Sequence, residues 1–177
     1  MGLEIFGINR LKEDFGLYGF LGKVKKRFTI FVQRSDLNLT NYHTNYTIAE
    51  ELSHYILHKE YFKDVNDVQE ALEFYTKISK ESEMMMEINA KYLAGAILVP
   101  KDDLARRAKE LYIINEPLFK DLLKNGNDET CENIIIALSS SLSDVYHAPE
   151  GTISFRLKTK AVDFKEYLKG RCNQRSK

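Results

Sequence analysis

Four side chains that commonly bind metals or transfer protons lie within residues 46–58, which read Y-T-I-A-E-E-L-S-H-Y-I-L-H. They are Glu50, Glu51, His54 and His58. An α-helix has 3.6 residues per turn, so Glu50, His54 and His58, each four residues apart, lie above one another on one face. Carboxylate and imidazole groups are ligands of divalent metals. The spacing therefore predicts a helix with a metal-binding face.

The same segment also carries an apolar face. Ile48, Leu52 and Ile56 repeat at the same four-residue spacing. This pattern is typical of an amphipathic helix that buries one side in a core and leaves the other accessible. We expect the apolar face to pack in the core and to hold the ligand face in place.

The frame of the segment matches that of the zinc-peptidase motif H-E-x-x-H. In that motif two histidines four residues apart bind the metal, and the Glu after the first activates a water molecule as a general base. Here the frame reads E-E-L-S-H over residues 50–54. Glu51 and His54 occupy the positions of the base and the second ligand, and Glu50 replaces the first His.

Residues 45–58, N-Y-T-I-A-E-E-L-S-H-Y-I-L-H, resemble the ImmA/IrrE family of metallo-endopeptidases, in which this helix typically reads R-F-T-[IL]-A-H-E-L-G-H-x-[IL]-L-H. A second block supports the resemblance. Residues 87–100, E-I-N-A-K-Y-L-A-G-A-I-L-V-P, are similar to the family pattern E-x-x-A-N-x-F-A-A-x-L-L-M-P, which supplies the third ligand. The resemblance covers the chain from about the first strand to near residue 158.

The resemblance implies a metal site formed by Glu50, His54 and Glu87, with Glu51 as the catalytic base. His58 is either a replacement ligand or a group that supports the ligands. Two carboxylate ligands weaken the Lewis acidity of the metal and favour harder ions. The resemblance therefore implies zinc, and the two carboxylates add manganese or iron(II) as alternatives.

Three segments are predicted as strands, namely Leu3–Ile8, Phe15–Val24 and Arg27–Gln33. Short connections between them predict a small antiparallel three-stranded sheet that packs on the metal-site helix. Thr44 or Asn45 is the expected N-cap of that helix.

The rest of the chain is predicted to be mostly helical, so the fold class is α+β. The expected helices are Asp64–Ser79, Glu81–Val99, Lys101–Tyr112, Pro117–Lys124 and Asp128–Ser143, with a turn at residues 125–127. Asp144–Leu157 resembles the family's closing segment, which looks like part of a helix-turn-helix.

We divide the chain into a zincin-like metallopeptidase core (1–100), a helical part of the same unit (101–162) and a basic tail (163–177). The last 22 residues carry a net charge of +6, and residues 1–155 carry −6. We favour a solvated terminus over a nucleic-acid contact for this charge.

Cys131 and Cys172 are too few and too isolated to form a disulfide framework. The sequence contains neither a signal peptide nor an apolar run of the roughly 20 residues that a membrane span needs. We expect a cytoplasmic protein.

Three functions remain open. The first is a metal-dependent endopeptidase that, by resemblance, cleaves a helix-turn-helix repressor of a mobile element or stress regulon. The second is an inactive relative that binds such a repressor. The third is a DNA-binding protein that uses residues 144–157 together with the basic tail.

Overall fold

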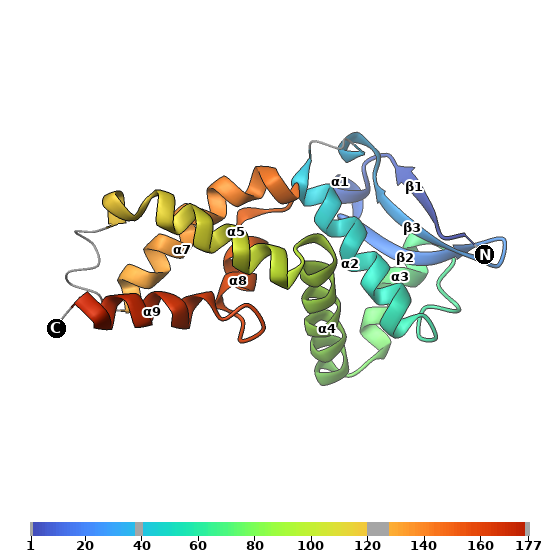
Figure 1. The fold of residues 1–177 in the computed structure, drawn as a ribbon. Coiled ribbons are helices and arrows are strands. Elements are labelled where there is room, and N and C mark those ends of the chain that lie inside the picture. The colour runs from blue at the N-terminus through green and yellow to red at the C-terminus, as the bar shows by residue number, and fades with distance from the viewer. Residues whose placement is uncertain (1, 38–40, 120–127, 176–177) are drawn as a thin grey trace. The chain divides into compact units, whose positions relative to one another are not determined.

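The computed structural model describes residues 2–37, 41–119 and 128–175 of the chain. The chain divides into two compact units, Met1–Ile97 and Leu98–Lys177 (Figure 1). The described part of unit 1 combines a three-stranded sheet with helices, and that of unit 2 is helical. The predicted α+β class is confirmed. No helix among the described residues is long and apolar enough to cross a membrane.

The sheet of unit 1 is mixed, whereas the sequence predicted a wholly antiparallel one. Its strands are β1 (Glu4–Ile8), β2 (Gly19–Val24) and β3 (Arg27–Gln33), in the order β1-β3-β2. Strands β2 and β3 form the expected antiparallel pair, but β1 runs parallel to β3. The connection between β1 and β2 contains the short helix α1 (Leu11–Phe15), and it is long enough to carry the chain past β3 to the opposite edge of the sheet.

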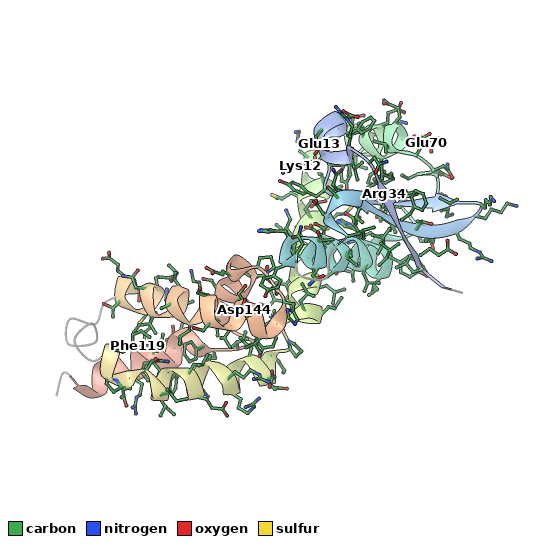
Figure 2. All side chains as sticks on the ribbon, turned by 90° about the horizontal axis from the view of Figure 1, so that it is seen from above. Lys12, Glu13, Arg34, Glu70, Phe119 and Asp144 are labelled. Atoms are coloured by element: carbon green, nitrogen blue, oxygen red, sulfur yellow. The ribbon has the colours of Figure 1, made fainter. Side chains whose placement is uncertain are left out.

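Helix α1 is fixed to the end of β3 by polar contacts. The backbone N–H of Lys12 donates to Oε1 of Gln33 at 3.2 Å, and Nε2 of Gln33 donates to Glu13 at 3.0 Å. Lys12 and Glu13 are labelled in Figure 2, which shows them on this helix. Gln33 is only 5% exposed, so these contacts satisfy a buried amide.

Helix α2 (Tyr42–His58) is the predicted metal-site helix, and it begins earlier than expected. Its N-cap is Asn41, whose side chain accepts the backbone N–H groups of His43 and Thr44 at 3.0 and 3.2 Å. The prediction of Thr44 or Asn45 as the cap was therefore wrong. Asparagine is as good an N-cap as the residues that follow it, so composition alone did not locate the helix start.

Helix α2 packs against β2 and β3, as predicted (Figure 1). Ile48 and Leu52 are partly buried against the core of unit 1, but Ile56 is 54% exposed. The residues of α2 that are most buried include Ala49 and Ser53. Small side chains at these positions allow the helix to lie close to the strands.

Gly19 is required for this close approach. A Cβ atom at residue 19 would lie 2.7 Å from Cγ2 of Thr47 on α2 and 2.8 Å from the carbonyl oxygen of Phe31. Neither distance is compatible with a side chain. The glycine therefore allows the edge strand β2 to lie directly beside the helix that carries the candidate ligands.

Two further helices complete unit 1. Helix α3 (Val68–Lys77) begins after Asp67, whose carboxylate accepts the backbone N–H of Glu70 at 2.9 Å. Helix α4 (Lys80–Leu98) carries Glu87 and ends just before Pro100, close to the predicted bounds. Met86, Ala90 and Ala94 of α4 are buried.

Unit 2 contains α5 (Lys101–Ile114), α7 (Asp128–Tyr146), α8 (Glu150–Lys158) and α9 (Phe164–Arg175). Residues 116–119 are also helical. The rest of the helix predicted at Pro117–Lys124, and the turn predicted at residues 125–127, lie outside the described residues. The buried side chains of the unit include Leu104, Tyr112, Ile134, Leu138, Ile153 and Leu157.

The segment Asp144–Leu157, predicted to resemble a helix-turn-helix, contains the end of α7 and most of α8. Arg156 is only 3% exposed, and its guanidinium donates to the carbonyl oxygen of Val99 at 3.2 and 3.1 Å. A buried guanidinium that is bonded to the backbone serves packing. Arg156 is therefore not available for contact with phosphate groups.

The basic C-terminal segment forms helix α9 and is not the solvated terminus that we expected. Phe164 and Leu168 are fully buried in the core of unit 2. Lys165 lies 2.8 Å from Glu132, and Lys169 lies 3.4 Å from Asp128. The basic residues thus face the acidic side of α7, while apolar residues between them enter the core.

Leu168→Ala should lower the free energy of unfolding of unit 2 by about 2 to 5 kcal/mol, because it leaves a cavity in the core. The measurement is chemical denaturation followed by circular dichroism. The exposed Lys160→Ala is the control and should change stability by less than about 0.5 kcal/mol. Equal, small effects of both variants would contradict the docking of α9.

Candidate metal and catalytic site

A cleft of about 860 Å³ in unit 1 contains most of the residues that the sequence singled out. Its walls come from α1, β2, β3, α2, α3 and α4. The side chains that line it and carry polar groups include Lys12, Asp36, His43, Tyr46, Glu50, Glu51, His54, Tyr75, Glu83 and Glu87. The structure thus places the predicted base and the three predicted ligands around one cavity.

His54 and Glu87 form the central contact of the cleft. Nε2 of His54 lies 3.4 Å from Oε1 of Glu87. His54 is 2% exposed, whereas Glu87 is 30% exposed toward the cleft. The hydrogen bond with His54 lowers the pKa of Glu87, although burial opposes it. Lys91, one turn further along α4, lies 3.6 Å from the other oxygen of Glu87.

Glu51 is buried beside the edge strand. Its side chain is 8% exposed, and the nearby backbone of Leu21 on β2 favours its charged form, against the larger effect of burial. Burial, followed by the charges of Glu50 and Glu87, raises the pKa of Glu51 well above its ordinary value. The close packing of α2 on β2 brings the predicted base to this backbone group.

Glu50 has an unsatisfied oxygen. Its Oε1 atom is buried and has no hydrogen-bond partner among the described residues. Burial, with a further contribution from the charge of Glu87, raises the pKa of Glu50. A buried acceptor without a donor costs about 1 to 3 kcal/mol or more, so this oxygen requires an explanation in terms of a ligand or a movement.

His58 lies on the other side of the His54 ring. The Nδ1 atoms of the two histidines are 3.3 Å apart, so one of them donates to the other. His58 does not line the cleft, and burial together with the charge of His54 lowers its pKa. In the hydrogen bond to Glu87 the Nε2–H of His54 donates, so Nδ1 of a neutral His54 accepts from His58. A metal bound at Nε2 would instead require the proton of His54 on Nδ1, where it would donate to His58. This arrangement suits a supporting role for His58 better than ligation.

The positions of the predicted ligands match part of the geometry that a metal ion requires. No three His, Cys, Asp or Glu side chains in the described ranges form a ready metal site. However, two ligand atoms that each lie about 2.0 to 2.2 Å from a tetrahedral ion are separated by about 3.3 to 3.6 Å. The 3.4 Å between His54 and Glu87 has this value. The unsatisfied oxygen of Glu50 is available as a third donor.

Two neighbours of Glu87 were not predicted from the sequence. Lys91 lies four residues after Glu87 on one helix, a spacing from which the ion pair was predictable. Tyr75 of α3 is different, because its hydroxyl lies 3.5 Å from Oε1 of Glu87 only through the packing of two helices. No pattern in the sequence predicted a contact between Tyr75 and the site.

The chain matches the model of the family described as IrrE N-terminal-like domain, Peptidase M78, over residues 4–158. Since the match covers most of the chain, the protein belongs to this metallopeptidase family. No curated protein and no solved structure matches the chain significantly. The family resemblance that rested on two sequence blocks is confirmed, whereas the roles of the individual site residues stay predictions.

Glu51→Gln should stabilise the metal-free protein, and increasingly so as the pH rises. Folding raises the pKa of Glu51 above its value of about 4.3 in the unfolded chain. The free energy of unfolding is therefore highest below that value, and it falls as the pH rises through the pKa of the folded state. Glutamine is neutral throughout and removes this loss. The melting temperature in chelator should therefore rise more at pH 8 than at pH 5, by about 2 to 4 °C for each kcal/mol.

The control for this experiment is Glu60→Gln, which removes an exposed carboxylate just beyond the end of α2. Its melting temperature should follow that of the natural protein across the same pH range. A Glu51→Gln variant that is equally or less stable than the natural protein at pH 8 would show that Glu51 is ionised and well solvated.

Proposed function

We propose that this member of the family is a divalent-metal-dependent endopeptidase that acts in the cytoplasm on a helix-turn-helix transcriptional repressor, as an antirepressor of a prophage or another mobile element. The observation that carries the metal-dependent chemistry is the contact of His54 with Glu87 at ligand spacing in a cleft that also contains Glu50 and Glu51. The repressor substrate rests on the family resemblance.

Glu50, His54 and Glu87 are the residues that would hold the metal. Zinc is the first expectation, and the two carboxylates keep manganese or iron(II) as alternatives. When bound, such an ion polarises the substrate carbonyl and acidifies a water molecule. The carboxylates of Glu50, Glu51 and Glu87 repel one another, and a cation among them would relieve this repulsion.

Glu51 is suited to take a proton from the attacking water. It is buried beside the backbone of Leu21 and is the residue that follows Glu50 on α2. The fixed position reduces the movement needed for proton transfer. His58 supports His54 from the side opposite to Glu87, which keeps the imidazole in one orientation.

Two observations favour a second function. Glu50 stands where the family pattern has its first His, and no ready three-residue metal site exists among the described residues. An inactive relative that binds a repressor through the cleft would have these features. A DNA-binding function has less support, because Arg156 is buried and Lys165 and Lys169 are paired with acidic residues.

Metal titration separates the enzyme from the inactive relative. The natural protein should bind Zn²⁺, Mn²⁺ or Fe²⁺ in isothermal titration calorimetry, and Glu50→His should bind Zn²⁺ more tightly because it supplies a neutral imidazole ligand. Binding by Glu50→His alone would support the inactive relative. Absence of binding in both forms would refute the placement of Glu87.

Glu51→Gln should retain the metal and lose hydrolysis, because it removes a base and not a ligand. The loss should be at least about 100-fold. Mass spectrometry of new protein N-termini in cells that produce the natural protein or Glu51→Gln measures it. A new terminus within a helix-turn-helix repressor should depend on Glu51, and identical termini in both cultures would contradict the peptidase.

A further inference from the structure

Tyr46 lies on the same face of α2 as the candidate ligands. It precedes Glu50 by four residues, which is about one helical turn, and both side chains line the cleft. The stripe therefore continues from His58 through His54 and Glu50 to Tyr46. Tyr46 adds a neutral O–H donor at the end of a row of acceptors.

The acceptor at this end of the stripe has no partner, and a donor lies one turn away. Oε1 of Glu50 is buried and has no hydrogen-bond partner among the described residues, and the half-buried side chain of Tyr46 lines the same cleft. The two groups are close enough for the charge of Glu50 to raise the pKa of Tyr46, after burial and ahead of Glu87.

The candidate ligand at this end of the stripe is a carboxylate, and the residue one turn before it is Tyr46. A carboxylate ligand has a second oxygen that must be satisfied when the first binds a metal. A phenol hydroxyl on the preceding turn supplies the donor for that oxygen.

We propose that Tyr46 is a positioning residue for Glu50. Its hydroxyl donates a hydrogen bond to one carboxylate oxygen and leaves the other oxygen directed toward His54 and Glu87. This inference rests on the proposed metal-dependent function, and it explains how a carboxylate replaces a histidine in this site.

The test is a double-mutant cycle of Tyr46→Phe and Glu50→His, read out as Zn²⁺ and Mn²⁺ affinity by competition with a chelating dye. In the natural background Tyr46→Phe should weaken metal binding about tenfold or more, as the loss of a hydrogen bond to a ligand does. In the Glu50→His background the same change should alter the affinity by no more than about twofold.

Tyr55→Phe is the matched control, because it makes the same chemical change on α2 at a residue that does not line the cleft. It should leave metal affinity unchanged in both backgrounds. The melting temperature of each variant in chelator checks that the fold is intact.

Each of the other possible results of the double-mutant cycle contradicts one part of the proposal. An equal effect of Tyr46→Phe in both backgrounds, or none in the natural background, overturns the positioning role while the metal site stands. Metal binding by Glu50→His alone shows that Glu50 is not a ligand, and it overturns the positioning role together with the active enzyme. Failure of every variant to bind metal refutes the proposed function itself.

Discussion

Burial of three neighbouring carboxylates is the constraint on which the site depends. Glu50, Glu51 and Glu87 line one cleft, and burial, followed by the charges of Glu50 and Glu87, raises the pKa of Glu51. Lys91 offsets part of this charge, because it lies 3.6 Å from Glu87 and its charge opposes the rise in the pKa of Glu50, but it is 56% exposed. A fold gains nothing in stability from such an arrangement without a cation. We infer that the cleft is built for binding and chemistry at the expense of stability.

The surrounding structure holds these acids in place despite their repulsion. The missing Cβ of Gly19 lets β2 lie beside α2, so the backbone of Leu21 reaches Glu51. Ser53, which is fully buried, donates to the carbonyl of Ala49 at 2.7 Å and fills the tight interface without a bulky side chain. Glu87 comes from a different helix, α4, and lies beside His54 of α2.

The sequence was most informative for elements whose residue pattern lies within one continuous segment. Helix α2 and strand β3 follow directly from local periodicity, and Glu87 followed from the second family block. Contacts that depend on tertiary packing were missed, such as Tyr75 against Glu87 and the parallel pairing of β1. The apolar pair Phe164 and Leu168 in α9 was hidden by the surrounding lysines and arginines, because net charge describes the exposed face of a helix and not the buried one.

The most direct measurement is a crystal structure of the natural protein soaked in Mn²⁺ or Zn²⁺, with anomalous diffraction recorded at the absorption edge of the metal. The cleft should contain one anomalous peak, about 2.0 to 2.2 Å from Nε2 of His54 and from one carboxylate oxygen each of Glu50 and Glu87. An ion bound elsewhere, or an empty cleft in which His54 remains bonded to Glu87, would contradict a metal-centred site.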